Sequence, residues 1–315
     1  MASVPAIHHR LMQFQYVSVF GTLARPRERC QGGGGRALGG AMSRRRWQAG
    51  RMAEHDQRDP ARVDPADVER ARALVADAER IVVLTGAGIS TDSGIPDFRG
   101  PNGVWTKNPK AEKLAHIDVY VSDPEVRERA WRNRLESPLS GAQPNAGHRA
   151  LVELEAGGHL VALLTQNIDG LHLAAGSDPN LVVQVHGTTT EVMCLSCDER
   201  APIQRALDRV AAGEADPACR SCGGILKTAV VSFGQNLAVA DLERSFDAAA
   251  GCDLLIAVGT SLGVYPIAEV VPTALRAGAA LVIVNAEPTP FDPYADVVLQ
   301  GSISEVLPAI VGVGT

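Results

Sequence analysis

Residues 81–90 read Ile-Val-Val-Leu-Thr-Gly-Ala-Gly-Ile-Ser, and this stretch decides the fold class. The run Ile81–Thr85 is almost wholly apolar and is followed by glycines, which predicts a parallel strand buried on both faces. Glycines directly after a strand let backbone N–H groups approach a pyrophosphate at a helix N-terminus. Because Thr91 stands where the usual dinucleotide fingerprint has a third Gly or Ala, the stretch alone is equally compatible with a tight strand-to-helix turn.

Similar apolar runs recur along the chain, separated by segments of helix length. They are Leu160–Thr165, Leu181–Val185, Leu254–Val258, Leu281–Asn285 and Asp296–Leu299. Helices are predicted after the N-cap Asp64, which precedes Pro65, and over Ile303–Ile310. This alternation predicts an α/β fold with a doubly wound, Rossmann-like parallel sheet formed by residues 61–100, 150–187 and 229–312. The insertions 101–149 and 188–228 interrupt the alternation and predict a second, smaller helical and cysteine-bearing domain.

Composition excludes several classes of protein. The 315 residues are 45% hydrophobic, which is enough for a sizeable core, and the apolar runs are too short to span a membrane. Nine arginines and one acidic residue lie in the first 51 residues, so the remainder carries a net charge of −14 against −6 for the whole chain. An acidic body disfavours nucleic acid as a specific partner. We therefore expect a cytoplasmic protein that binds neither membranes nor nucleic acids.

The basic N-terminal segment, residues 1–60, is predicted to be a disordered leader. It lacks a sustained apolar period and contains the runs Gln31-Gly-Gly-Gly-Gly-Arg36 and Ser43-Arg-Arg-Arg46. The favoured interpretation is that an upstream start codon adds a non-functional leader before Met42 or Met52. A transit peptide or a segment that binds acidic surfaces remains an alternative.

Polar residues follow the ends of several predicted strands. Thr165 is followed by Gln166-Asn-Ile-Asp-Gly170, Val258 by Gly259-Thr-Ser261, and Val284 by Asn285-Ala-Glu287. Ligands of doubly wound sheets bind beyond the carboxyl ends of the strands. Together with the glycines after Thr85, these turns predict a dinucleotide site. His186 leaves a strand at the same edge and is the candidate general base.

The cysteines give the most specific spacing in the chain. Cys194 and Cys197 form one Cys-x2-Cys pair, and Cys219 and Cys222 form another after 21 intervening residues. This is close to the four-cysteine zinc-ribbon pattern and favours zinc over paired disulfides. Four thiolates fill the coordination shell, so we expect one structural Zn²⁺ per chain.

The order of these motifs resembles that of the sirtuins, the NAD-dependent protein lysine deacylases, over about residues 66–312. The matching stretches are Gly86-Ala-Gly-Ile-Ser90, Gly94-Ile-Pro-Asp-Phe-Arg-Gly100, Thr165-Gln-Asn-Ile-Asp169, Val185-His-Gly187, the two Cys-x2-Cys pairs, Val231-Ser-Phe-Gly234, Gly259-Thr-Ser-Leu262 and Val284-Asn-x-Glu287. The resemblance implies that an acyl-lysine protein and NAD, as co-substrate, are converted to free lysine, nicotinamide and O-acyl-ADP-ribose.

The resemblance also implies residue roles. His186 would be the base that deprotonates a ribose hydroxyl, with Asn167 and Asp169 as further catalytic residues and Val231, Ser232, Phe233 and Gly234 as peptide contacts. The residues expected to bind NAD are Gly86, Ala87, Gly88, Ser90, Ile95, Asp97, Phe98, Arg99, Trp105, Gln166, Asn167, Ile168, Asp169, Gly259, Thr260, Ser261, Asn285, Ala286, Glu287 and Ile303.

Departures from the family pattern concern the acyl group. Sirtuins that remove succinyl or malonyl groups resemble one another in a Tyr-x-x-Arg pair, which residues 104–115 lack. Acetyl or longer aliphatic groups are therefore expected. Gly103-Val-Trp-Thr106 resembles a branch that includes long-chain deacylases and ADP-ribosyltransferases, and Lys227-Thr228 replaces the commoner Arg-Pro. Mono-ADP-ribosyl transfer and non-catalytic NAD sensing are the alternative functions.

Overall fold

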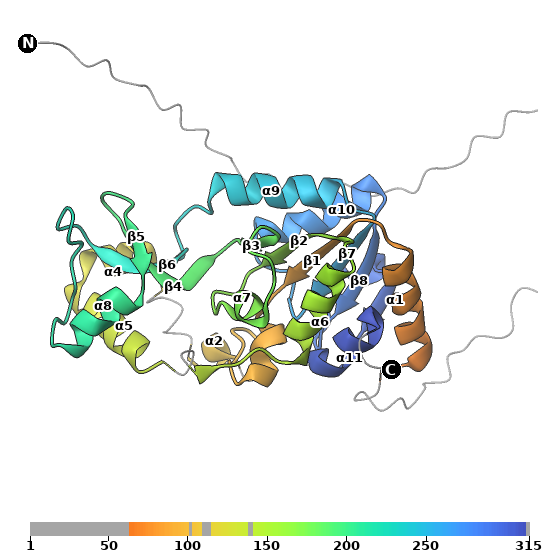
Figure 1. The fold of residues 1–315 in the computed structure, drawn as a ribbon, viewed down its shortest axis with the longest axis horizontal. Coiled ribbons are helices and arrows are strands. Elements are labelled where there is room, and N and C mark those ends of the chain that lie inside the picture. Colours follow the sequence, from red (N-terminus) through yellow and green to blue (C-terminus); the bar gives the residue numbers. More distant parts are fainter. Residues whose placement is uncertain (1–62, 101–102, 109–114, 138–140, 313–315) are drawn as a thin grey trace, which may run out of the picture. The chain divides into compact units, whose positions relative to one another are not determined.

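The computed structural model describes residues 63–100, 103–108, 115–137 and 141–312 (Figure 1). The predicted leader, residues 1–60, and the candidate start sites Met42 and Met52 lie outside the described residues. Within the described part, no helix is both long enough and apolar enough to cross a membrane.

The main sheet has six parallel strands in the order β3-β2-β1-β7-β8-β9. Their bounds are β1 Ile81–Thr85, β2 Leu160–Thr165, β3 Val182–Gln184, β7 Leu254–Val258, β8 Ala280–Val284 and β9 Val297–Leu299. All six strands predicted from apolar runs are present, three of them with the predicted bounds. The doubly wound fold class is confirmed, and the strand order reverses between β1 and β7, which is where such sheets bind ligands.

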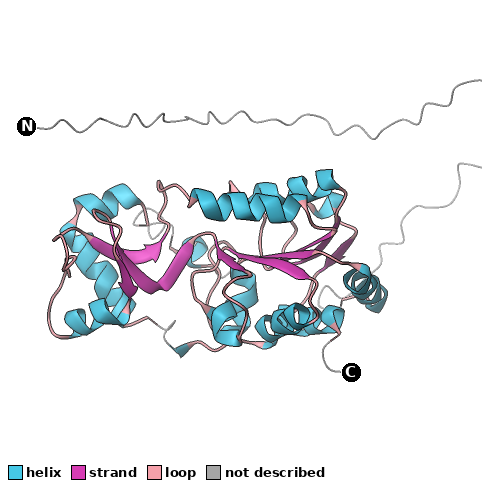
Figure 2. Cartoon of the chain, turned by 45° about the horizontal axis from the view of Figure 1, so that its top comes forward, coloured by secondary structure: helices cyan, strands magenta, loops and turns pink. Residues whose placement is uncertain are grey.

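Helices cover both faces of this sheet (Figures 1 and 2). On one face lie α1 Pro65–Asp77, α6 Ala146–Ala156 and α11 Ile303–Val311; on the other lie α9 Val239–Ala250 and α10 Val270–Ala277. Residues of β1 alternate between the two cores, with Ile81 and Val83 in the first and Val82 and Leu84 in the second. Every residue of β1 is therefore buried, which is why its sequence reads as a continuous apolar run.

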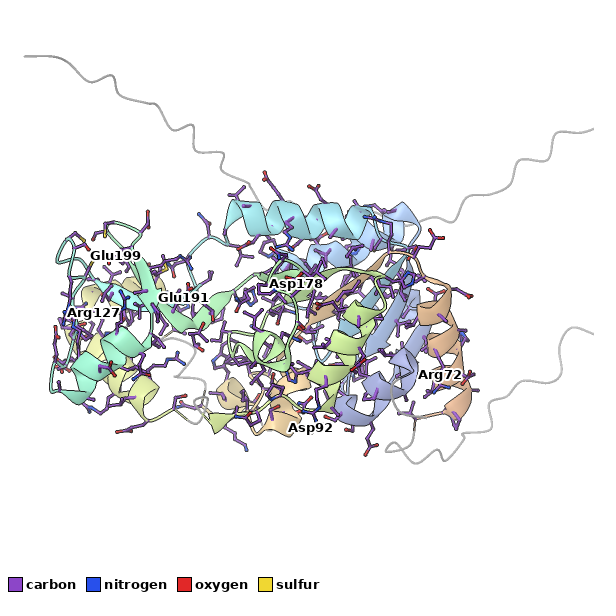
Figure 3. The ribbon with its side chains drawn as sticks, in the orientation of Figure 1. Arg72, Asp92, Arg127, Asp178, Glu191 and Glu199 are labelled. Atoms are coloured by element: carbon purple, nitrogen blue, oxygen red, sulfur yellow. The ribbon has the colours of Figure 1, made fainter. Side chains whose placement is uncertain are left out.

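A smaller unit is built around a three-stranded antiparallel sheet in the order β5-β4-β6. It contains β4 Gly187–Cys194, β5 Arg200–Pro202, β6 Leu226–Val230, α4 Ile117–Ser122, α5 Pro124–Leu135 and α8 Gln204–Ala211. Its own core includes Trp131, Val192 and Ala206. Arg127, labelled in Figure 3, pairs with Asp216 at 2.7 Å and ties α5 to the segment after α8.

Short elements complete the chain: η1 Ala87–Ser93, α2 Val104–Lys107, α7 Leu171–Ala175, η3 Ile267–Glu269 and η4 Asp292–Tyr294. The segment after β1 is thus a 3-10 helix, η1, where the glycine pattern suggested a regular helix N-terminus.

The helix α6 begins at Ala146, so its first four residues lie in the segment 101–149, which was expected to belong to the smaller domain. Its N-cap is Asn145, whose side chain accepts from Gly147 N and donates to Ile89 O at 2.7 Å. This first turn is therefore bonded to η1 beside the large sheet. A pattern of apolar residues does not reveal such a contact, because a polar side chain makes it.

Gly259 is expected to be irreplaceable, because it combines a left-handed backbone (φ 60°) with a Cβ position 2.5 Å from Ile89 N. We expect Gly259→Ala to lower the free energy of unfolding by about 2 kcal/mol or more, through strain and overpacking. Urea unfolding measures this. Gly278→Ala is the matched control, since Gly278 has φ 93° but nothing within 4 Å of its Cβ position. Equal losses in the two variants would contradict the importance of the close contact.

Candidate functional site

The four polar turns predicted at strand ends lie on neighbouring strands. Gly86 N donates to Val258 O at 2.9 Å, and Gly259 N donates to Val284 O at 2.8 Å. On the other side of β1, Gln166 N donates to Thr85 O at 3.0 Å. The carboxyl ends of β2, β1, β7 and β8 are therefore joined into one continuous edge at the point where the strand order reverses.

Side chains also bridge these turns. Gln166 Nε2 donates to Thr260 Oγ1 at 2.9 Å, linking the turn after β2 to the turn after β7. Thr260 and Asn285 are buried, and Asn285 Nδ2 donates to Glu287 O at 2.6 Å. Ser261, Ala286 and the Glu287 residue as a whole are exposed. The edge thus has buried, fixed polar groups at its base and accessible ones at its rim.

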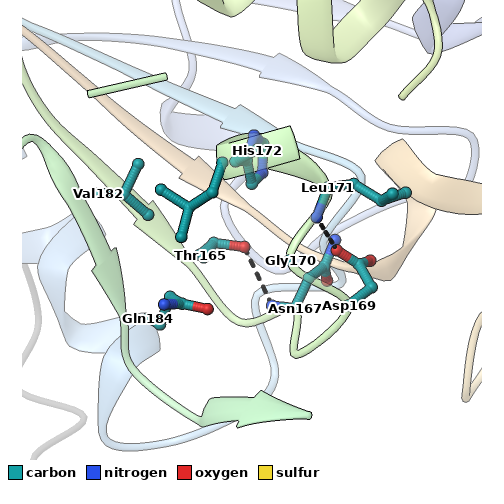
Figure 4. Close-up of a pocket in the computed structure, with 9 residues that line it drawn as sticks. Thr165, Asn167, Asp169, Gly170, Leu171, His172, Val182 and Gln184 are labelled. Atoms are coloured by element: carbon teal, nitrogen blue, oxygen red, sulfur yellow. Dashed lines mark hydrogen bonds between the residues drawn. The ribbon is translucent and has the colours of Figure 1, made fainter. Parts of the chain in front are cut away.

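A compact polar cluster lies between β1 and β2. Asn167 Nδ2 donates to Gly86 O at 3.0 Å and to Ser90 Oγ at 3.2 Å. Ser90 Oγ in turn donates to Asp169 Oδ2 at 2.8 Å, while the other carboxylate oxygen accepts from Leu171 N at 2.9 Å. Asn167 and Ser90 are buried, at 7% and 1% exposure. Figure 4 shows Asn167 and Asp169 lining a small pocket with Thr165, Gly170, Leu171, His172, Val182 and Gln184. Leu173 also lines this pocket.

His186 is half-buried directly before β4, next to the turn after β2. Its Nδ1 lies 3.0 Å from Gln166 O. A carbonyl oxygen only accepts, so Nδ1 carries the proton in this bond and Nε2 of the neutral ring keeps its lone pair. Burial lowers the pKa of His186, the bond to Gln166 opposes this, and the nearby Arg99 cation lowers it further. The ring is therefore neutral at pH 7 and can accept a proton at Nε2.

Aromatic rings connect the segment after η1 with the segment after β6. The ring centroids of Phe98 and Trp105 lie 4.7 Å apart, and those of Trp105 and Phe233 lie 5.3 Å apart. The Arg99 guanidinium lies 4.8 Å from the centroid of the Trp105 ring. The structure thus brings the residues predicted to bind the cofactor against Phe233, which is predicted to contact the peptide.

The other predicted residues are placed as follows. Ile95 N donates to Ser90 O at 3.3 Å, and Asp97 O accepts from Val104 N at 2.9 Å, so both belong to the segment that folds over η1. Ala87 and Gly88 are the first two residues of η1. Ile168 lies in the turn after β2, and its carbonyl oxygen accepts from Thr189 N at 2.9 Å. Ile303 is only 8% exposed and belongs to the core between α6 and α11.

Two histidines that the sequence did not single out, His148 and His172, lie beneath this cluster. His148 Nε2 lies 3.5 Å from Ser90 Oγ, and His172 Nε2 lies 2.9 Å from Thr85 Oγ1. Their ring centroids are 5.0 Å apart. Thr85 also donates to Thr165 Oγ1 at 2.9 Å, in register across β1 and β2. The available signal was that two buried apolar strands both end in threonine.

The four cysteines also gather as predicted. Their Sγ atoms all lie within 4.8 Å of one another, with Cys194 and Cys222 at 3.5 Å and Cys197 and Cys219 at 3.7 Å. A tetrahedron with Zn–S bonds of about 2.3 Å has edges of roughly 3.8 Å. Backbone N–H groups of Ser196 and Gly224 point at Cys194 and Cys222 at 3.4 Å, as is favourable for thiolates. The cluster therefore fits a zinc site.

We expect the buried histidines to make folding sensitive to acid. Burial lowers the pKa of His148 to about 4 and that of His172 to about 3, so below pH 6.5 the unfolded chain binds more protons than the folded one. The contribution of these histidines to the free energy of unfolding is fully present above pH 6.5. As the pH decreases from there toward 5, each histidine lowers this free energy by about 1.4 kcal/mol per pH unit. In urea unfolding, His172→Gln should remove that much of the slope. His159→Gln, at an exposed residue, is the control; the same slope in the two variants would contradict the assignment.

Comparisons with known proteins agree with this geometry. A family model described as the Sir2 family matches residues 86–266. The chain is 48% identical over 230 residues to NAD-dependent protein deacetylase 2 of Streptomyces coelicolor, covering 73% of this chain and 95% of that protein. It is 41% identical over 238 residues to NAD-dependent protein deacylase 2 of Pyrobaculum aerophilum, covering 76% and 92%.

Solved structures give the same answer. A Sir2 structure with a deacetylated p53 peptide and 3′-O-acetyl ADP ribose is 35% identical to this chain, with a TM-score of 0.71 over 78% of this chain and 97% of that one. A Sir2 structure bound to an acetylated peptide is 32% identical, with a TM-score of 0.69 and the same coverage. The chain belongs to the Sir2 family, the sirtuins.

Proposed function

We propose that the protein removes acetyl or longer aliphatic acyl groups from lysine side chains of proteins, in a reaction that consumes NAD. The observation that carries the proposal is the position of His186: a neutral imidazole is bonded to the turn that also bears Asn167 and Asp169. Simple binding of a dinucleotide requires no such base, so this observation disfavours an NAD sensor. The relatives are named deacetylases and deacylases, which disfavours ADP-ribosyl transfer as the main activity.

The residues present fit NAD. The turn after β1 packs closely on the turn after β7, since a Cβ at Gly86 or Gly88 would lie 2.7 Å from Gly259 atoms, and Ala87 and Gly88 are partly exposed beside this contact. Buried amide and hydroxyl groups of Asn167 and Ser90 provide fixed partners in the interior, and the turns after β7 and β8 extend the polar edge. When bound there, NAD would supply the ribose carbon that accepts the acyl oxygen and the nicotinamide that leaves.

The chain's own residues divide the remaining work. Asn167 and Asp169, both bonded to Ser90, orient groups in the interior pocket. The neighbouring rings of Phe98 and Trp105 would shield the bound cofactor from water. Gln166 and Thr260, fixed to each other, position the ribose and pyrophosphate, and Asn285 and Glu287 the adenosine end. His186 accepts a proton at Nε2 from a ribose hydroxyl, while its Nδ1–H remains bonded to Gln166 O.

The acyl-lysine peptide would lie against Val231–Gly234. This segment is held between two others: Val231 N donates to His186 O at 2.9 Å, and Phe233 N donates to Ala115 O at 3.1 Å. The peptide is thereby brought next to the base and to the aromatic wall. We also propose a cytoplasmic location, because a four-thiolate site requires cysteines that stay reduced.

The proposal is tested by incubating the protein with NAD and acetyl-, propionyl-, succinyl- and myristoyl-lysine peptides, followed by mass spectrometry. We expect free lysine and O-acyl-ADP-ribose from the aliphatic peptides and none from the succinyl peptide. His186→Ala should reduce deacylation by about 10²-fold or more, the range for a general base, with NAD binding retained. His159→Ala, at an exposed residue, is the control. Near-wild-type deacylation by His186→Ala would remove the role assigned to this ring.

A second variant separates the base from the pocket. Nicotinamide leaves before the base is needed, so His186→Ala should still exchange labelled nicotinamide with NAD in the presence of acyl-peptide. Asn167→Ala should lose exchange as well, because its amide acts in the pocket itself. Equal exchange in both variants would contradict this division of roles.

We propose that Cys194, Cys197, Cys219 and Cys222 hold one structural Zn²⁺. Metal analysis should give one zinc per chain, and chelation should unfold the small unit and abolish activity indirectly, because structural zinc contributes roughly 10–16 kcal/mol of apparent binding energy. Circular dichroism and an activity assay, before and after zinc is restored, measure both effects. Full activity in a folded, metal-free protein would exclude a structural role.

A further inference from the structure

Lys227 is a buried cation within the small unit. It lies on β6 and is only 3% exposed, although lysine is one of the residue types least often buried. Among the described residues, no carboxylate forms an ion pair with it. Desolvation alone lowers the pKa of its ammonium group to about 8. A buried, unpaired charge is costly, so a lysine at this position needs an explanation beyond packing.

The partners of Lys227 are the last residue of its own strand, Val230, and Gln235 in the segment that follows. The ammonium group donates to Val230 O and, at 3.0 Å, to Gln235 Oε1. The same Gln235 oxygen accepts from Ser232 N at 2.9 Å, and Gln235 N donates to Ser232 O at 3.0 Å. Lys227 and Gln235 therefore form a clamp that closes residues 230–235 into a fixed loop from its inner side.

This loop is the segment to which the proposed function assigns the acyl-lysine peptide. Elsewhere the loop is held by backbone bonds, from Val231 N to His186 O and between Phe233 and residues 115 and 117, and by the contact of the Phe233 ring with Trp105. Within the described residues, the clamp supplies the side-chain hydrogen bonds that fix the loop's backbone from inside. Because Lys227 is almost fully buried, it acts on the peptide through the loop.

We propose that Lys227, together with Gln235, is a positioning residue that holds the loop Val231–Gly234 in the conformation that accepts the acylated peptide. The inference rests on the proposed function for the identity of the ligand. The pair consists of one charged side chain, Lys227, and one amide side chain, Gln235. Three hydrogen bonds join these side chains to each other, to Val230 O and to Ser232 N.

The chemistry of the pair supports positioning more than stability. A methionine would fill a similar volume in this interior without the desolvation cost of an ammonium group. The ammonium group offers something a methionine lacks, because hydrogen bonds from a charged donor are stronger than those between neutral groups and can therefore order the loop. Preorganisation of a binding loop lowers the entropy lost when the ligand binds, so the effect is expected in peptide affinity.

The test compares steady-state kinetics of Lys227→Met, Lys227→Arg and Gln235→Ala with the wild-type full chain, using NAD and an acetyl-lysine peptide. We expect Lys227→Met to raise the KM for the peptide at least tenfold, with the KM for NAD and kcat at saturation within about twofold of wild type. Lys227→Arg keeps the donors and should restore the peptide KM to within about threefold. Arg205→Met, which removes an exposed cation from the same unit, is the control and should change neither constant.

The double variant Lys227→Met/Gln235→Ala tests whether the pair acts as a unit. Its peptide KM should be no higher than that of the worse single variant, because each substitution already breaks the clamp. If the increases in peptide KM of the two single variants multiply in the double variant, or if the KM values for peptide and NAD rise equally, the proposal is overturned in favour of general destabilisation. If Lys227→Met does not fold, an unchanged peptide KM in Gln235→Ala overturns it.

The wild-type protein in the same assay reports on the underlying function. If it removes no acyl group from any peptide of the panel, the proposed function fails. If it deacylates normally while the folded variants show unchanged peptide KM values, the proposed function stands and the inference about Lys227 fails alone.

Discussion

The site depends on one close contact between two backbones at the carboxyl ends of β1 and β7. Gly88 N donates to Gly259 O at 2.9 Å, and a Cβ on either glycine would lie within 2.7 Å of the other turn. Because no side chain separates the turns, η1 packs directly on the turn after β7. This contact fixes Gly86 where its carbonyl accepts from Asn167, so the glycines shape the interior pocket as well as the edge.

Beneath that contact lies a layer of buried polar groups rather than an apolar floor. Thr85, Thr165 and His172 form one hydrogen-bonded group, and Ser90 with Asn167 forms the next. Buried polar networks are costly when incomplete and rigid when complete, which suits groups that must orient a ligand. The remaining free atom is His172 Nδ1, which has no partner among the described residues. The layer therefore trades stability at low pH for fixed geometry beneath the site.

The sequence predicted the features that depend on short-range patterns. Apolar runs located the strands, and cysteine spacing located the four-sulfur cluster, because burial and tetrahedral coordination impose local patterns. It did not predict that Asn145 joins α6 to η1, that His148 reaches Ser90, or that Lys227 holds Gln235. Each of these is a single polar contact made by the fold, and two of them join segments more than 50 residues apart. Such contacts produce no repeating pattern in the sequence, so a polar residue within a helix or strand is taken to be exposed at the surface.

The strand β4 connects the two chemistries of the molecule. His186 immediately precedes its first residue, Gly187, and its last residue is the metal-site cysteine Cys194. The irregular β4 pairs with β6 from Gly187, opposite Val230, to Cys194, opposite Leu226, a span of roughly 13 Å for the four steps along β6, so a metal ion at the cysteines does not reach the atoms on which His186 acts. Its influence must pass through the sheet. β6 pairs with β4, placing Lys227 opposite Met193 and Val230 opposite Gly187. The same two strands thus carry the base, the peptide loop and its clamp, and ordering the small unit at the cysteines orders all three.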